Sequence, residues 1–335
     1  MTVTTAAPAR RGSILLATVL LCVSAIPLIP LGADYLNYVN IFETARSSTF
    51  SELFSQRYEP LFLALSSLFA YLTTDDVTVF AALMVIATAM KVTVVYRLAW
   101  HRQAAVLVLA WYALRFFPLH ELTQIRIALA LGLWLLAVTT RSAPKAFALT
   151  IAAALTHYST AILLPVLWAW RAVERSPEGY RRIELRLLLG GITVIVVVGV
   201  TLRQLLEQLS LIFSILDIYS SEGFGEERVN PFSIAVLLDS FFLLTGWLVA
   251  SNNARSRFWL TLLTLSLATF YVLFDFPVLA HRIREMFGIC WLPYLAYALH
   301  QRGAPGLHAR LVIAASIPAY IYIDFFGTFA LFPVG

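Results

Sequence analysis

The chain of 335 residues is 60% hydrophobic and only 13% charged, with a mean hydropathy of +0.80. A soluble domain is about half apolar and about a quarter charged, so this composition excludes a soluble enzyme and indicates a protein embedded in a lipid bilayer. The net charge of +5 comes mostly from short arginine clusters between apolar runs, a pattern that is typical of membrane topology and not of a nucleic-acid-binding surface.

Apolar runs follow one another through almost the whole chain. They lie at about 13–31, 61–72, 77–96, 104–117, 127–138, 146–170, 187–202, 231–250, 258–274, 286–299 and 311–332. A membrane-spanning helix needs roughly 20 apolar residues. The runs therefore predict an all-α, polytopic integral membrane helix bundle with about 10–11 transmembrane segments, and residues 1–335 are expected to form a single polytopic domain.

The positions of arginine and lysine predict the orientation of these segments. Basic residues are enriched in cytoplasmic loops, which places the N-terminus, with Arg10 and Arg11, in the cytoplasm together with Arg97. The first run then ends outside, and the run at 77–96 can end inside at Arg97 only if the short run at 61–72 does not cross the membrane. A re-entrant or interfacial helix is therefore predicted near residues 59–74. The run at 146–170 is basic at both ends, and we expect it to leave and return as two limbs that break near residues 156–160.

Two acids and three tyrosines stand in the first predicted outer loop and just before the second run. They are Asp34, Tyr35, Tyr38, Tyr58 and Glu59. Aromatic faces stack on sugar rings and carboxylates accept hydroxyl protons, so these residues are candidates for sugar recognition. The alternative is a plain helix start, in which Pro60 occupies the first turn, Glu59 complements the helix dipole and the tyrosines belong to an interfacial aromatic belt.

Four arginines lie where predicted segments meet the outer face. They are Arg115, Arg126, Arg282 and Arg284. A guanidinium binds phosphate bidentately, and two neighbouring cations suit a diphosphate. Snorkelling is the alternative for Arg126, although the dipole at a helix N-terminus disfavours a cation there. For Arg282 and Arg284 the alternative is pairing with Glu285 or Asp275.

His157 interrupts an apolar run and precedes three hydroxyl residues. A histidine in this setting can act as a general base near neutral pH, and the alternative is a histidine whose hydrogen bond is satisfied inside the bundle. The sequence contains no P-loop, dinucleotide, zinc-protease or kinase motif. The scattered acids give no indication of a metal site.

In order and spacing, these residues resemble the EpsG branch of the Wzy-type polysaccharide polymerases. The resemblance covers residues from about 30 to 295 and consists of Asp34 with Tyr35 and Tyr38, Glu59–Pro60, Ile125–Arg126 before a small-residue helix with Ala128, His157 followed by Leu164–Pro165, and Arg282–Ile283 before an aromatic helix. The family's arginine is usually followed by Gln. Here Ile127 follows and Gln124 precedes, which leaves the role of the amide open.

The resemblance implies a GT-C-like membrane glycosyltransferase that needs neither a cofactor nor a metal. Such an enzyme joins oligosaccharide repeat units carried on undecaprenyl diphosphate into O-antigen or exopolysaccharide, at the periplasmic or outer face of the bacterial inner membrane. By this analogy Arg126 and Arg282, with Arg284 and Arg115, hold the diphosphate. Glu59 or His157 acts as the base, and Asp34 positions the acceptor sugar, with Tyr35, Tyr38, Tyr58 and Gln124 as further sugar ligands.

The expected partners are the lipid-linked oligosaccharide, the bilayer, and the flippase and chain-length regulator of the same pathway, but no nucleic acid. Two other readings stay open. One is another polyprenyl-linked GT-C glycosyltransferase or ligase, which often carries a large soluble outer domain. The other is a transporter or flippase for a lipid-linked sugar, which is expected to show internal repeats.

Overall fold

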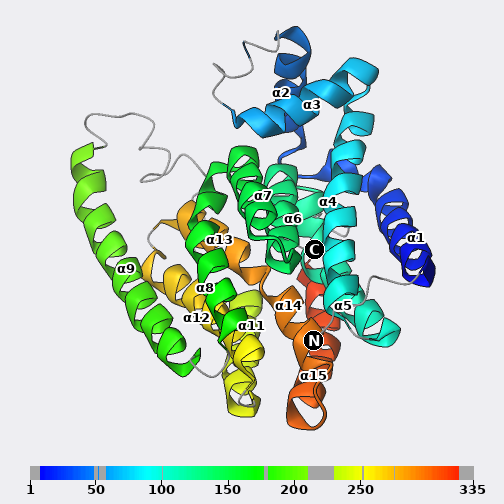
Figure 1. Ribbon diagram of the computed structural model, residues 1–335. Helices are drawn as coiled ribbons and strands as arrows, with labels where there is room; N and C mark the ends of the chain where they lie inside the picture. The colour runs from blue at the N-terminus through cyan, green and yellow to red at the C-terminus, as the bar shows by residue number, and fades with distance from the viewer. Residues whose placement is uncertain are drawn as a thin grey trace. The chain divides into compact units, whose positions relative to one another are not determined.

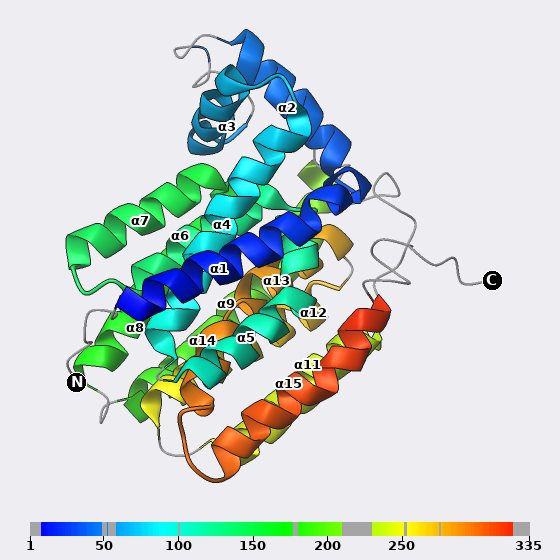
Figure 2. The same ribbon diagram turned by 90° about the vertical axis from the view of Figure 1, so that its right-hand side faces the viewer.

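The computed structural model describes residues 8–48, 52, 58–99, 101–176, 180–209, 230–250, 253–274 and 276–323, and this part of the chain is built of helices (Figures 1 and 2). It divides into two compact units. The first unit comprises Met1–Trp168 and Ile313–Gly335, and the second unit comprises Ala169–Val312.

The first unit is organised around α4. Its elements are α1 (Pro8–Ala25), the 3₁₀-helix η1 (Ile26–Leu31), α2 (Tyr35–Ser47), α3 (Pro60–Leu72), α4 (Asp76–Leu98), α5 (Arg102–Arg115), the π-helix η3 (Phe117–Glu121), α6 (Ile125–Thr139), α7 (Ala143–Thr156) and the 3₁₀-helix η4 (Tyr158–Leu163). α8 (Leu164–Arg175) and α15 (Ala304–Ile323) each contribute one end. α1 and α6 pack along α4, α7 packs on α6, and α2 with α3 lies at the beginning of α4 (Figures 1 and 2).

Local sequence signals explain where these helices begin. The side chain of Asp75 caps α4 by accepting a hydrogen bond from the backbone N–H of Thr78 at 3.0 Å, which satisfies one of the donors left free at a helix start. Pro60 opens α3, where its missing N–H costs nothing. Ser142 caps α7 in the same way as Asp75 caps α4.

The second unit is organised around α12. It contains α9 (Tyr180–Leu209), α11 (Ile234–Val249), α12 (Ala254–Val272), α13 (Pro277–Gly288) and α14 (Trp291–Ala298). α12 packs against the other four helices. The apolar run at 286–299 is not one element, because α13 ends at Gly288 and α14 starts at Trp291. Pro293 lies in the first turn of α14, where its missing N–H is tolerated, whereas the same residue inside a continuous helix would break it.

Three of the described helices are long and apolar enough to cross a membrane, judged by length and composition. They are the segments Asp76–Leu98, Glu184–Thr201 and Ala304–Ile323. A fourth span results if Leu15–Leu31 and Tyr35–Ser47, which meet at a bend of 95°, are counted together, and four shorter apolar helices accompany them. The structure is thus that of an all-helical membrane protein, while the predicted total of about 10–11 crossings and the GT-C-like arrangement stay predictions.

Two expected irregularities are present in the first unit. The helix predicted near residues 59–74 is α3, which has 13 residues and at 1.5 Å per residue is too short to cross a bilayer. The predicted break near residues 156–160 is confirmed, since α7 ends at Thr156 and η4 separates it from α8. The second irregularity places His157 at the junction between α7 and η4.

Candidate functional site

Glu59 is held by the turn that precedes α3. Its backbone is extended (φ −64°, ψ 127°) at the N-cap position, yet its carboxylate makes no capping hydrogen bond. The residue is only 6% exposed. A buried carboxylate needs partners of its own, and both of its oxygens find them on other helices.

Arg126 supplies the first partner. It is the second residue of α6, and its guanidinium donates a hydrogen bond from an η-nitrogen to Oε2 of Glu59 at 2.9 Å. The same guanidinium lies 5.9 Å from the centroid of the Tyr38 ring, within the range of a cation–π contact. The side chain of Arg126 remains 28% exposed, so a ligand can reach this residue.

His157 supplies the second partner. It follows the last residue of α7 with an extended backbone (φ −156°, ψ 109°), and this end of the helix turns its ring toward α3. Nδ1 of His157 lies 2.8 Å from Oε1 of Glu59. Three segments that are distant in the sequence therefore meet at one carboxylate, and these three residues are called the Glu59 cluster below.

The electrostatics of the Glu59 cluster favour the ionised form of the carboxylate. Burial by itself raises the pKa of Glu59, but the hydrogen bond from His157 and the charge of Arg126 outweigh it and lower the pKa to about 2. An ionised carboxylate can only accept hydrogen bonds, so Nδ1 of His157 carries a hydrogen and donates it to the carboxylate, and in the neutral form of the ring Nε2 has a free lone pair. No described residue forms a hydrogen bond with Nε2.

This geometry places a proton acceptor near a group that can bind an anion. A carboxylate that orients an imidazole and stabilises its protonated form is the arrangement that activates hydroxyl nucleophiles in many transferases and hydrolases. The guanidinium on the other oxygen is suited to a phosphate. The cluster can therefore take a proton from a hydroxyl group beside a bound anion.

The other predicted residues of the first unit have different surroundings. Asp34 is half-buried at the N-cap of α2 without a capping hydrogen bond. Tyr38 is 3% exposed and packs edge-on against Phe62 and Phe80. The remaining candidates are placed as follows: Tyr35 half-buried beside Phe80, Tyr58 and Gln124 half-buried, and Arg115 buried with its guanidinium over the rings of Phe116 and Tyr320.

Gly32 brings the start of α2 close to the start of α6. A Cβ atom at this glycine would lie 2.3 Å from the carbonyl oxygen of Leu122, a separation that no side chain tolerates. The absence of a side chain therefore lets the turn before Asp34 pack directly on the backbone that precedes Arg126.

The two arginines predicted in the second unit differ in their surroundings. Arg282 is exposed. Arg284 is 4% exposed, forms an ion pair with Asp239 of α11, and lies over the ring of Phe270 with 5.5 Å to its centroid. The sequence interpretation considered Glu285 and Asp275 as partners and missed Asp239, although a single acid inside an apolar run is a signal in its own right. Asp275 lies outside the described residues.

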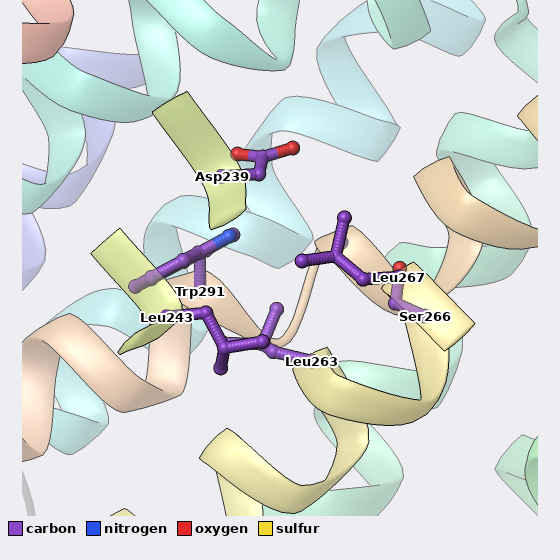
Figure 3. Close-up of a pocket in the computed structure, with 7 residues that line it drawn as sticks. Asp239, Leu243, Leu263, Ser266, Leu267 and Trp291 are labelled. Atoms are coloured by element: carbon purple, nitrogen blue, oxygen red, sulfur yellow. The ribbon is translucent and has the colours of Figure 1, made fainter. Parts of the chain in front are cut away.

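Asp239 also lines a small pocket in the second unit. Figure 3 shows its carboxylate on one side of walls that are mainly apolar. The lining residues are Asp239, Leu243, Leu263, Ser266, Leu267, Gly288 and Trp291. Because Arg284 already neutralises the only charged residue among these seven, the pocket offers no free charge to a ligand. That Arg282 and Arg284 act on the same diphosphate as Arg126 stays a prediction.

A second buried ion pair was also missed from the sequence. Lys91 of α4 and Glu121 of η3 have no exposed side-chain surface and bind each other. Both are isolated charges within or beside apolar runs, which is again the pattern of a functional or structural intramembrane group. Among the described residues, no three His, Cys, Asp or Glu side chains gather as a metal site would require.

The fold and the Glu59 cluster define a helical membrane protein with a buried carboxylate that links an imidazole to a guanidinium. The model of the EpsG family matches residues 13–332, nearly the whole chain, and the chain therefore belongs to the EpsG family. This membership confirms the resemblance seen in the sequence and makes the chain a membrane protein of polysaccharide biosynthesis. No curated protein and no solved structure matches the chain.

Proposed function

We propose that this protein is a polysaccharide polymerase that joins undecaprenyl-diphosphate-linked oligosaccharide repeat units at the periplasmic face of the bacterial inner membrane. The observation that carries the proposal is the position of Glu59, whose two oxygens bind Nδ1 of His157 and the guanidinium of Arg126. Family membership supports the polymerase class, and the cluster supports a glycosyl transfer that uses a base and a phosphate ligand.

In this scheme His157 is the general base and Glu59 is its positioning residue. With a pKa of about 2, Glu59 is too weak a base to deprotonate a hydroxyl group. Nε2 of His157 takes the proton of the acceptor hydroxyl, the oxygen bonds to the anomeric carbon of the donor, and the bond from that carbon to the diphosphate breaks. The electron pair leaves on the diphosphate, and the imidazolium that has formed keeps its hydrogen bond to the Glu59 carboxylate.

Arg126 meets the negative charge that develops on the leaving diphosphate. Such a preorganised cation in a site shielded from water stabilises a transition state more than it does in bulk water. Of the two predicted diphosphate ligands in the second unit, Arg282 is exposed whereas Arg284 is held by Asp239, which favours Arg282 for this role. Because a diphosphate is already a good leaving group and guanidiniums neutralise it, the scheme does not depend on a divalent metal.

The acceptor sugar is assigned to the residues beside the Glu59 cluster. Asp34 is half-buried and its carboxylate does not cap α2, so it can accept hydrogen bonds from sugar hydroxyls. Tyr35, Tyr58 and Gln124 are half-buried and complete the proposed sugar ligands, while the buried ring of Tyr38 supports Arg126.

The test is an assay of the purified protein in liposomes that contain a lipid-linked repeat unit. We expect a ladder of longer chains and release of undecaprenyl diphosphate. His157→Gln should abolish the ladder, whereas the matched control His101→Gln, at an exposed position before α5, should leave it unchanged. Movement of substrate across the bilayer without elongation would instead identify a flippase, and transfer of one unit to an acceptor of another kind would identify a ligase.

A further inference from the structure

Lys91 is a fully buried cation in α4, a helix that is long and apolar enough to span the membrane. Burying an ammonium is costly unless it is paired and hydrogen-bonded. Its carboxylate partner, Glu121, is equally buried. A pair of apolar residues of similar volume would fill the same space, and such replacements are often neutral or stabilising. The charges therefore call for an explanation other than stability.

The ammonium of Lys91 contacts the chain on both sides of Arg126. It pairs with Glu121, the last residue of η3, and it donates a hydrogen bond to the carbonyl oxygen of Ala128 at 2.9 Å. Two backbone hydrogen bonds span the stretch between these contacts. The N–H of Gln124 bonds to the carbonyl of His120, and the N–H of Ala128 bonds to the carbonyl of Gln124, each at 3.0 Å.

α4 and α6 approach each other closely, so the side chain of Lys91 can contact the start of α6. A Cβ atom at Gly132 of α6 would lie 2.8 Å from Cε and 3.1 Å from Cβ of Met90, the residue before Lys91. The missing side chain at Gly132 thus lets the two helices pack closely one turn beyond Ala128. The contact of Lys91 with the first turns of α6 depends on this spacing.

We propose that Lys91 is a positioning residue, which clamps the junction of η3 and α6 through Glu121 and Ala128 and so holds Arg126 in the orientation that the diphosphate requires. The role of Arg126 in this inference rests on the proposed function. The clamp itself concerns only how the contacts of Lys91 hold the backbone on both sides of Arg126. The first turn of a helix lacks half of its intrahelical hydrogen bonds and frays easily. A fixed charge with directional bonds on both sides of the turn removes that freedom.

The test compares the full-length protein with the double variant Lys91→Met/Glu121→Leu, which removes both charges together and keeps the volume. The matched control is Arg257→Met/Glu184→Leu, which removes an ion pair of the second unit. Amide hydrogen exchange over residues 121–129 reports the clamp directly, and exchange over α7 serves as the internal reference. The polymerisation assay gives kcat and KM for the lipid-linked repeat unit.

We expect the double variant to fold, to exchange about tenfold faster over residues 121–129 and not over α7, and to lose about 100-fold in kcat/KM, mostly in kcat, because small misplacements of a binding group have this effect. The control should match the wild-type protein in both measurements. If the double variant does not fold, Gly132→Val, which adds two methyl groups beyond a Cβ that already lies 3.1 Å from Cβ of Met90 and keeps both charges, should accelerate exchange over the same residues.

Unchanged exchange over residues 121–129 in a folded double variant, or in Gly132→Val if the double variant does not fold, overturns the clamp, whatever the activity is. Faster exchange with unchanged kcat and KM also overturns it, since Lys91 would then hold the backbone without serving the reaction. Faster exchange in a protein whose wild-type form makes no polymer supports the clamp and refutes the proposed function instead.

Discussion

Replacing Glu59 by Gln tests the division of labour within the Glu59 cluster. The substitution keeps the shape of a side chain that is 6% exposed, but it removes the charge and adds an amide that can donate. Once the amide donates to Nδ1 of His157, the hydrogen moves to Nε2, and the ring can no longer accept a proton from the acceptor. A comparable change in the serine protease triad, which leaves the geometry intact and inverts the tautomer, lowers kcat about 10⁴-fold.

We therefore expect Glu59→Gln to lower kcat by about 10³- to 10⁴-fold, equivalent to about 4–5 kcal/mol of transition-state stabilisation. KM for the lipid-linked repeat unit should change much less, because Arg126 keeps its side chain and its charge. The assay is release of undecaprenyl diphosphate in liposomes under single-turnover and steady-state conditions. Glu43→Gln, at an exposed position of α2, is the control. A kcat of Glu59→Gln within about tenfold of the wild-type value would refute the role of the carboxylate in holding His157.

Three further predictions concern the same unit. Arg126→Lys keeps the charge but not the planar fork, so kcat/KM should fall about 10- to 100-fold in the polymerisation assay, and full activity would remove Arg126 from the site. The pKa of Glu59, about 2, lies below its ordinary value of 4.5, so its contribution of about 3 kcal/mol to the unfolding free energy is present above pH 4.5 and is lost as the pH falls toward 2. The unfolding free energy, measured in mixed micelles as a function of pH, should show this loss in the wild-type protein and not in Glu59→Gln. The same dependence on pH in both proteins would contradict the prediction. Gly32→Ala places a Cβ 2.3 Å from the carbonyl oxygen of Leu122 and should lower stability by about 1–3 kcal/mol, whereas Gly12→Ala, inside α1 with open space around it, should not lower Tm.

Local sequence features predicted the irregular parts of the first unit well. The short α3 and the break after α7 follow from run length and flanking charges, which depend only on neighbouring residues. Run length did not predict that the apolar run at 286–299 is divided between α13 and α14. The length of an apolar run does not show that Pro293 prevents the preceding helix from continuing. α3 and α13 begin at a proline, and α4, α7 and α12 begin after a capping side chain.

The candidate site was predicted in its residue types but not in its connections. The sequence selected Glu59, Arg126 and His157 as candidate functional residues, and the structure brings these three together. The sequence left open which of Glu59 and His157 is the base. The position of a proton depends on which carboxylate oxygen contacts which ring nitrogen, and the sequence does not show these contacts. Pairing choices such as Arg284 with Asp239 were equally out of reach of the sequence.

The sequence by itself determined that the chain lies in a membrane as a series of helices, because lipid requires each segment to be apolar and to satisfy its own backbone. Only the tertiary structure decided how the few charges are paired. An ion pair such as Lys91 with Glu121 depends on the packing of helices that are distant in the chain, and apolar helix surfaces by themselves permit many packings. The close approach at Gly132 selects one of them.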